Sequence, residues 1–450
     1  MSASTTPAAV QSDPRTRDLL QRRHRTLGRH SPLFYSEPLE LVRGRGVRVE
    51  DSAGRSYLDA YNNVPHVGHA HPEVARAVHE QMQRLALHTR YLNENVLDYA
   101  EQLLATFEPG LDRVAFSNSG SEANELALRV ARQHTGARGV LVSDWSYHGT
   151  TSALAEVTTA LAAGEPFADH ARRLRVPDAT GLDAAATAEL LAAALREVDQ
   201  AVESLDRAGH GVALVLIDPL FTTEGLVRVP DGYVDGLARR VRAAGGLVVS
   251  DEVQAGFGRT GTSMWGYQEH GIVPDLVTLG KPMGNGHPLG GTVLRADLLE
   301  EFGARNEYFN TFGGNPVSAA AGRAVLEVMR AERLRERAVA LAPVLSAGLH
   351  DVAATSPGIV AVRGQGLFQG LEFVDPATGG PDGGAARAVV EGVRRAGVLI
   401  SRIGRHGNVL KIRPPLAIEE ADVRTLLDRL ADVVAEVGTG SREPAGQRPS

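Results

Sequence analysis

The sequence predicts an α/β protein with a mainly parallel sheet, followed by a smaller α+β unit. Four short, uniformly apolar runs are typical of strands that are buried on both faces of a sheet, at residues 114–117, 212–217, 247–250 and 276–279. Stretches with helical spacing lie between these runs. After Gly322 the alternation gives way to long amphipathic helices and short strands, and this change in pattern indicates a second unit.

Individual elements follow from the same patterns. Residues 122–133 are expected to form the helix after the first strand, and the alanine-rich, acidic residues 182–207 are expected to form a surface helix. In the smaller unit, strands are expected at 358–374 and 409–412. A strand pair at 47–58 is expected to join that unit.

These elements lead to a predicted division of the chain into four parts. We expect an N-terminal segment of the small domain, a large ligand-binding domain, a C-terminal small domain and a disordered tail, at residues 1–74, 75–330, 331–437 and 438–450. Ligands of such sheets bind beyond the carboxyl ends of the strands, so the functional residues are sought there.

Composition excludes several classes of function. The net charge is −7 and no basic block is present, which argues against nucleic-acid binding. With no cysteine, the chain has no disulfide, thiolate metal site or cysteine nucleophile. No run approaches the roughly 18 apolar residues of a membrane span, and no secretory signal is visible. A soluble, cytoplasmic protein is expected.

Residues 118–124 combine a strand end, a glycine turn and a helix start. Free N–H groups at such a helix start, with the Ser121 hydroxyl, would bind a phosphate. Serine is also a common helix N-cap, so on this segment alone a purely structural role is the alternative.

Asp251 and Glu252 follow an apolar strand directly. Carboxylates are rarely buried without a charged partner, and a pyridinium nitrogen would be a suitable partner for Asp251. A helix-capping role is the structural alternative, more fitting for Glu252 than for both residues.

Lys281 also follows an apolar strand and precedes a glycine-rich turn. If it is partly desolvated and close to other cations, its pKa is lowered and its amine becomes a nucleophile. An exposed loop lysine is the alternative.

Together these segments resemble the class III aminotransferases, and the resemblance runs from about residue 30 to 435. The family's motifs occur in order, at residues 57–60 (YLDA), 66–72 (HVGHAHP), 119–124 (SGSEAN), 147–149 (YHG), 251–254 (DEVQ), 280–281 (GK) and 311–316 (TFGGNP). The resemblance implies a pyridoxal-phosphate (PLP) enzyme of fold type I, with a seven-stranded, mainly parallel sheet in its large domain.

The resemblance also implies roles for the motif residues. Lys281 forms the Schiff base with PLP, and Asp251 binds the pyridinium nitrogen, which makes the ring an electron sink. Gln254 hydrogen-bonds the phenolic oxygen. Tyr147 stacks on one face of the ring, and its neighbour His148 belongs to the same cofactor-binding motif.

The remaining cofactor contacts come from three places in the chain. Val253 packs on the other face of the ring, while Gly120 and Ser121 hold the phosphate. Thr311 is expected to reach the phosphate of the neighbouring subunit. This last contact implies a homodimer with sites shared across the interface.

Two departures from the majority pattern concern the substrate. The gating glutamate of many family members aligns with Thr223, although Glu224 is adjacent. The arginine that clamps the substrate α-carboxylate is replaced by Lys411, with Arg413 two residues on. Lysine lacks the bidentate fork of arginine, so both changes argue against a standard glutamate and 2-oxoglutarate pair.

Three segments resemble one branch of the family, the phospho-lyases of ethanolamine phosphate and phosphohydroxylysine and their alanine–glyoxylate aminotransferase relatives. They are residues 62–69 (NNVPHVGH), 280–288 (GKPMGNGHP) and 408–415 (NVLKIRPP). Lys411 and Arg413 would then receive a phosphate or phosphonate.

Two enzymatic interpretations stay open. An aminotransferase acting on a primary amine or amino acid and a carbonyl acceptor is favoured modestly, on the frequency of this activity in the family. A lyase that expels phosphate, or another leaving group, from the same carbanion is the alternative. A catalytically inactive binding protein is disfavoured by the joint presence of Lys281, Asp251, Gln254 and Thr311.

His66, His69 and His71 have a spacing that suggests a metal site. The resemblance places this segment in a loop near the substrate entrance of a metal-free fold, so we reject the metal interpretation.

Overall fold

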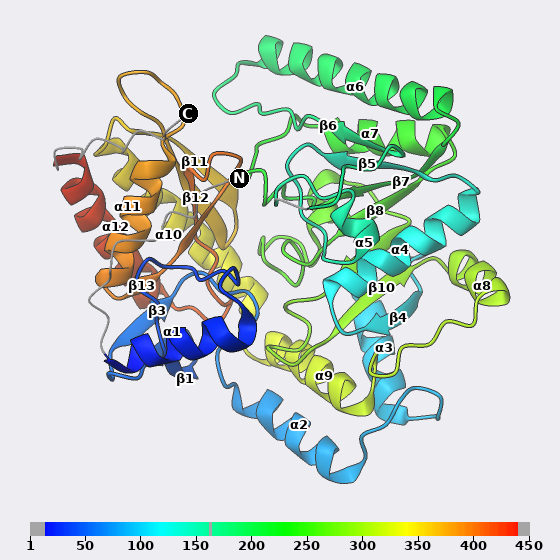
Figure 1. Cartoon of the computed structure of the whole chain (residues 1–450), viewed down its shortest axis with the longest axis horizontal. Coiled ribbons are helices and arrows are strands. Elements are labelled where there is room, and N and C mark those ends of the chain that lie inside the picture. The colour runs from blue at the N-terminus through cyan, green and yellow to red at the C-terminus, as the bar shows by residue number, and fades with distance from the viewer. Residues whose placement is uncertain (1–13, 162–163, 440–450) are drawn as a thin grey trace.

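A seven-stranded sheet forms the larger part of the protein in the computed structural model, which describes residues 14–161 and 164–439 (Figure 1). Its strands, in spatial order, are β4 (Arg113–Ser117), β10 (Gly290–Leu294), β9 (Leu276–Leu279), β8 (Leu247–Asp251), β7 (Val212–Ile217), β5 (Gly139–Ser143) and β6 (Ala171–Leu174). Only β10 runs antiparallel to its neighbours in this sheet. The predicted α/β class with a mainly parallel sheet is therefore confirmed.

Helices cover both faces of this sheet, as the uniformly apolar strands predict. On one face, Leu214 and Leu216 of β7 belong to the same buried cluster as Leu126 of α4 (Gly120–Thr135). On the other face, Val215 packs in the cluster that contains residues of α6 (Ala184–Arg207) and α7 (Tyr233–Ala243). Two further helices, α5 (Ser152–Ala155) and α8 (Ala296–Arg305), pack against α4. The core thus lies on both sides of the strands.

Local sequence explains where these elements begin and end. The Ser119 side chain accepts the Glu122 N–H at the start of α4, and Gly136 ends the helix with a φ of 68°. At the start of α9 (Pro316–Ala331), Asn315 accepts two backbone N–H groups and proline occupies the first turn. Helix α9 packs against α2 (Pro72–Arg84) and α3 (Glu94–Leu104).

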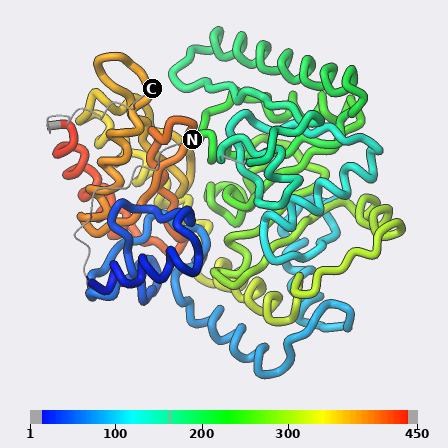
Figure 2. Tube along the Cα trace, in the orientation of Figure 1, coloured from blue at the N-terminus to red at the C-terminus, as the bar shows by residue number. Residues whose placement is uncertain are grey.

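Two four-stranded sheets make up the second part. One contains β1 (Leu41–Arg45), β2 (Arg48–Asp51), β3 (Ser56–Asp59) and β13 (Val398–Leu399), and the other contains β11 (Ile359–Gln365), β12 (Phe368–Phe373), β15 (Val409–Lys411) and β14 (Ser401–Ile403). The parallel pairing of β13 with β3 joins the first strands of the chain to a late one. Figure 2 shows the blue N-terminal segment beside the orange and red C-terminal segment.

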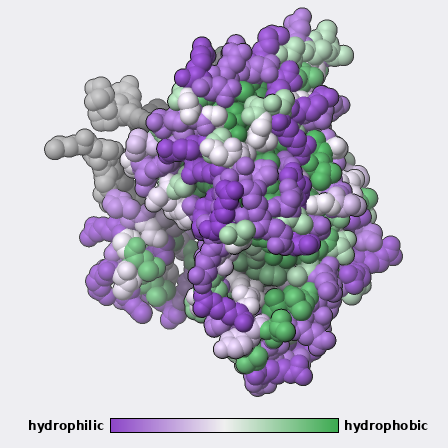
Figure 3. Space-filling model, turned by 90° about the vertical axis from the view of Figure 1, so that its right-hand side faces the viewer, coloured by the Kyte–Doolittle hydropathy of each residue, from purple (hydrophilic) through white to green (hydrophobic). Residues whose placement is uncertain are grey.

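The helices of this second part are α1 (Pro14–Leu27), α10 (Leu334–Ala354), α11 (Gly383–Arg395) and α12 (Glu420–Thr439). Of the tail predicted at 438–450, the first two residues belong to the end of α12 and residues 440–450 lie outside the described part. The face shown in Figure 3 is mainly hydrophilic, with apolar patches toward its lower edge. In the part of the chain that the structure describes, no helix combines the length and apolar character of a membrane span.

Candidate active site

A cavity of about 290 Å³ lies at the carboxyl ends of the central strands. It brings together eight residues that the sequence analysis selected for the cofactor, namely Gly120, Ser121, Tyr147, His148, Asp251, Val253, Gln254 and Lys281. They come from the ends of β4, β8 and β9 and from the loop after β5. This convergence follows from the topology, because parallel strands present their carboxyl ends at one edge of the sheet.

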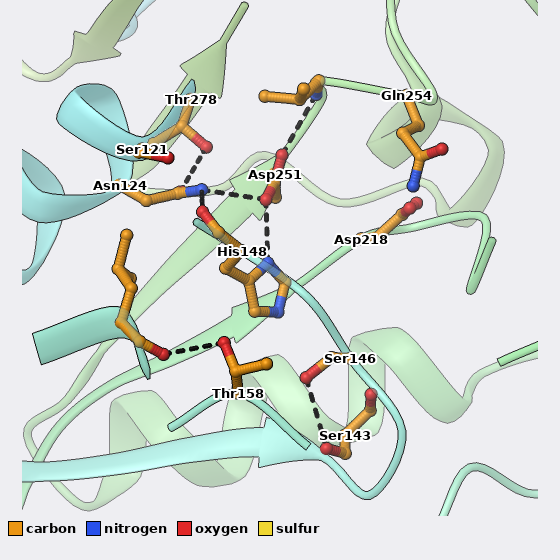
Figure 4. Close-up of polar contacts among 12 residues, drawn as sticks. Ser121, Asn124, Ser143, Ser146, His148, Thr158, Asp218, Asp251, Gln254 and Thr278 are labelled. Carbon is orange, nitrogen blue, oxygen red and sulfur yellow. Dashed lines mark hydrogen bonds and ion pairs between the residues drawn. The ribbon is translucent and has the colours of Figure 1, made fainter. Parts of the chain in front are cut away.

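Asp251 is a buried acidic residue that lines the cavity (Figure 4). One carboxylate oxygen accepts hydrogen bonds from His148 Nδ1 at 2.8 Å and Asn124 Nδ2 at 2.9 Å. The other accepts the Val253 N–H at 3.1 Å. These donors fix the carboxylate while leaving acceptor capacity toward the cavity, which suits a ligand N–H.

Its neighbour Glu252 has a structural role. The buried Glu252 carboxylate accepts the N–H groups of Gly266 and Tyr267 at the start of η1 (Gly266–His270), at 2.7 and 2.9 Å. Burial raises its pKa to about 8. The capping alternative therefore describes Glu252, although the helix that it caps lies 14 residues further on.

The start of α4 forms a cradle beside Asp251. Ser119 provides the N-cap, which leaves the Ser121 hydroxyl at the cavity, where it accepts the Thr150 N–H at 3.2 Å. A Cβ on Gly120 would lie 2.8 Å from Val253 Cγ2, so only glycine fits without displacement. Backbone N–H groups at a helix start with this open approach suit a phosphate.

Lys281 follows β9 and its side chain is accessible from the cavity. Although the residue is exposed at the cavity, the protein groups around its amine desolvate it and lower its pKa; the charge of Arg413 lowers the pKa further, while Asp251 acts in the opposite direction. A lowered pKa increases the fraction of neutral amine, as a nucleophile or base requires. The chain contains only two lysines, and the second, Lys411, lies next to this cavity.

Lys411 and Arg413 converge on Gln254. Their side chains donate to Gln254 Oε1 at 2.8 and 2.6 Å, and the Gln254 amide nitrogen donates to Thr222 Oγ1 at 2.6 Å. Both cations are buried, and burial is the main cause that lowers both pKa values, to about 10 for Arg413. The Thr222 hydroxyl in turn donates to Asp218.

Three predicted residues lie away from this cavity. Thr223 is half-buried and contributes a backbone carbonyl to Gly404 N at 3.2 Å. Glu224 accepts a hydrogen bond from Ser143, and burial raises its pKa to about 8. Thr311 is exposed. The described cavity is therefore lined without these three side chains, and Lys411 and Arg413 contact it only through Gln254.

Several contributors were missed in the sequence analysis. Asp218 and His287 line the cavity, Asn124 holds Asp251, and Thr222 contacts Gln254. Asn124 lies within the quoted helix-start motif, so its position on the turn after Ser121 could have revealed it. Thr222 had no such signal, because its role depends on contacts with distant segments.

The three histidines at 66, 69 and 71 point to different partners. His66 Nε2 contacts the Phe257 carbonyl at 2.7 Å, His69 contacts Asp59 at 2.7 Å and His71 contacts Glu332 at 2.9 Å. Among the residues that the structure describes, no group of three or more His, Asp or Glu side chains could hold a metal ion.

A buried carboxylate with free acceptor capacity toward the cavity, a helix start that only glycine fits and a lysine of lowered pKa fit the ring nitrogen, phosphate and aldehyde of PLP. Fold and site together define a PLP-dependent enzyme of fold type I. The chain belongs to the class III aminotransferases, whose family description "Aminotransferase class-III" matches residues 35–434. The cofactor is pyridoxal phosphate.

Known proteins similar to this chain carry two kinds of name. A solved phospholyase from Arthrobacter, in complex with phosphoethanolamine, is 54% identical with a TM-score of 0.92, over 93% of this chain and 99% of that one. "Ethanolamine-phosphate phospho-lyase homolog 1" of Caenorhabditis elegans is 36% identical over 96% of both chains. "Alanine--glyoxylate aminotransferase 2-like" of Drosophila melanogaster is 37% identical, over 90% of this chain and 85% of that one.

Proposed function

We propose that this protein is a PLP-dependent amino-phospho-lyase acting on a small phosphorylated primary amine, such as ethanolamine phosphate. The observation that carries the proposal is the buried pair Lys411 and Arg413 beside the cavity. The sequence alone favours an aminotransferase modestly. The buried pair and the 54% identity to a phospholyase reverse that order.

The two buried cations call for an anion. Lys411 and Arg413 are 7% and 3% exposed, and within the described residues neither forms an ion pair with a carboxylate. Both donate to the neutral carbonyl oxygen of Gln254, and Arg413 also donates to the neutral Tyr61 backbone carbonyl at 3.3 Å, with the rings of Tyr61 and Phe368 on their flanks. A buried charge without a counterion destabilises the folded protein, because it has lost its hydration and gained no opposite charge. A bound phosphate dianion would supply that opposite charge.

The chain's own residues then divide the work. When bound, PLP acts as an electron sink for the carbon that bears the amine. The neutral amine of Lys281 removes a proton from that carbon. Lys411 and Arg413 hold the phosphate and stabilise the negative charge that it gains as the C–O bond breaks. With one water, ethanolamine phosphate would give acetaldehyde, ammonia and phosphate.

A test without any acceptor separates the two activities. Purified holoenzyme is incubated with ethanolamine phosphate, and phosphate and ammonia are measured together, with unphosphorylated ethanolamine as the matched control. Repeated turnover that releases both products in equal amounts from the phosphorylated amine supports the proposal. Turnover that requires a keto acid and releases no phosphate would instead establish an aminotransferase.

We further propose a homodimer in which Thr311 reaches the cofactor phosphate of the partner. Thr311 is exposed and Phe312 beside it is 69% exposed, while Leu92 on another loop is 97% exposed. Exposed apolar side chains of this size favour burial at an interface. Light scattering gives the mass in solution, and a monomer that binds PLP tightly would exclude the shared site.

The predicted division at residues 74, 330 and 437 and the predicted cytoplasmic location stay proposals. The pairing of β3 with β13 supports placing the opening segment with the C-terminal domain. Limited proteolysis, followed by mass spectrometry of the fragments, tests the boundaries, and fractionation of the source cells tests the location.

A further inference from the structure

Thr222 links the acidic and basic groups beside the cavity. Its side chain is fully buried, at 0% exposure, in the turn that follows β7. Its hydroxyl donates to the Asp218 carboxylate and accepts from Gln254 Nε2 at 2.6 Å. A continuous hydrogen-bonded chain therefore runs from Asp218 through Thr222 and Gln254 to the two cations.

The direction of this chain is dictated by the groups at its ends. Lys411 and Arg413 carry only donors, so the Gln254 atom that faces both of them is the carbonyl oxygen. Its amide nitrogen must then face Thr222. The single hydroxyl hydrogen of Thr222 goes to the carboxylate, which leaves the oxygen as the acceptor.

Gln254 has one hydrogen-bond donor left for a ligand. The carbonyl oxygen has two partners, and of the two N–H groups on Nε2 one is taken by Thr222. In the described part of the chain the second N–H has no partner, and Gln254 lines the cavity together with Lys281. Once the first N–H is fixed, the planar amide leaves only one direction for the second.

We propose that Thr222 is a positioning residue for the cofactor. By holding one N–H of Gln254, it aims the other at the phenolic oxygen of bound PLP. The same contact keeps the carbonyl oxygen on Lys411 and Arg413, so the cofactor and the basic pair are connected through one amide. This role holds for a lyase and an aminotransferase alike, and it does not depend on the identity of the amine.

The visible absorbance of bound PLP, titrated with pH and without substrate, reports on this contact. A donor at the phenolic oxygen favours its anionic form, so weakening the donor raises the pH midpoint. Thr222→Val is expected to raise the midpoint by about half a pH unit, while Thr222→Ser, which keeps the hydroxyl, stays close to the wild-type value. Thr222→Ala removes the methyl group together with the hydroxyl, so it introduces no new apolar contact beside Asp218, and it provides a second route to folded protein.

Gln254→Ala tests whether Thr222 acts through Gln254. The charged groups around this amide, Asp218, Lys281, Lys411 and Arg413, are unchanged in all of these variants. We expect Gln254→Ala to raise the midpoint at least as far, and the double variant with Thr222→Val to add nothing further. Thr425→Val on α12 makes the same chemical change far from the cavity, where the hydroxyl only bonds the Ala421 carbonyl, and serves as control. A wild-type midpoint in Thr222→Val or Thr222→Ala, or additive shifts in the double variant, would overturn the inference.

Discussion

Replacement of Lys411 by methionine tests two effects of the buried cation separately: its effect on the stability of the folded protein and its effect on phosphate binding. The Lys411 side chain is 7% exposed, and its ammonium donates to Gln254 at 2.8 Å beside Arg413. Burial is the main cause that lowers its pKa, and Arg413 and then Lys281 lower it further. Methionine has a similar length and no charge, so it removes the charge while keeping most of the packing.

Lys411→Met is expected to stabilise the folded protein and to weaken binding of the phosphorylated amine. Replacing a buried charge that has no carboxylate partner with an apolar side chain is expected to stabilise the substrate-free protein by about 1 kcal/mol. A charge-assisted hydrogen bond to phosphate contributes about 1.5–3 kcal/mol, so its loss weakens binding of the phosphorylated amine about 10- to 150-fold. The charge of Lys411 is therefore expected to lower the stability of the wild-type protein and to strengthen its binding of an anion.

Two measurements check this reasoning. Urea unfolding in a phosphate-free buffer gives the stability, and calorimetry with inorganic phosphate gives the anion affinity. Arg424→Met is the control, because this exposed cation pairs with Glu420 on α12 and should leave phosphate affinity unchanged. A destabilised Lys411→Met protein with wild-type phosphate affinity would refute both effects assigned to Lys411.

The same variant has a defined pH dependence. Because the folded-state pKa of Lys411 lies below its unfolded value of 10.5, the unfolded chain binds more protons between the two values. This group therefore makes the wild type more stable as pH rises through that window. The stability advantage of Lys411→Met should shrink toward alkaline pH, and an advantage that grows would contradict the assignment.

Three further changes test the remaining parts of the site. Gly120→Ala places a Cβ 2.8 Å from Val253 and should lower PLP affinity, measured by equilibrium dialysis, at least tenfold. Gly303→Ala is the control: it lies in a helix with open space around it and should stabilise the protein by about 1 kcal/mol. Asn124→Leu removes a buried donor to the carboxylate beneath the cavity and should destabilise the cofactor-free protein by about 2–3 kcal/mol in urea. Because burial raises the folded pKa of Glu224 to about 8 from 4.5, the folded state holds the extra proton between these values and the wild type loses stability as pH rises through that window. Glu224→Gln should therefore gain stability relative to the wild type from pH 5 to pH 8, by about 3–4 kcal/mol at about 1.36 kcal/mol per pKa unit.

The fold could be predicted from the sequence where a strand is buried on both faces, because such a strand is marked by its apolar residues. Strands β7, β8 and β9 are buried on both faces; β7 is an unbroken apolar run, whereas β8 ends in Ser250 and Asp251 and β9 contains Thr278. Strand β10 begins with two glycines, and its antiparallel direction is set by its partners β4 and β9 rather than by its own residues. Local pattern carries no information on such pairing.

The sequence alone could identify those site residues whose position follows from the sheet topology. Residues at the strand ends converge because the topology of a parallel sheet fixes where those ends lie, so Asp251 and Lys281 could be found from the chain alone. Thr222 and Thr223 are neighbours of the same type, and only tertiary contact shows that the first one faces Gln254. Alignment with a family motif drew attention to Thr223, whose side chain lines no part of the cavity.

The chain has only two lysines, and this scarcity has a practical consequence. Both primary amines of its side chains stand at or beside the cofactor cavity, and the rest of the surface carries its positive charge on arginine and histidine. An amine-selective reagent such as a succinimidyl ester therefore has no lysine on the outer surface to modify. Apart from the terminal amine, any label that the protein takes up reports on access to the cavity, so a simple intact-mass measurement becomes a footprint of cofactor and anion occupancy.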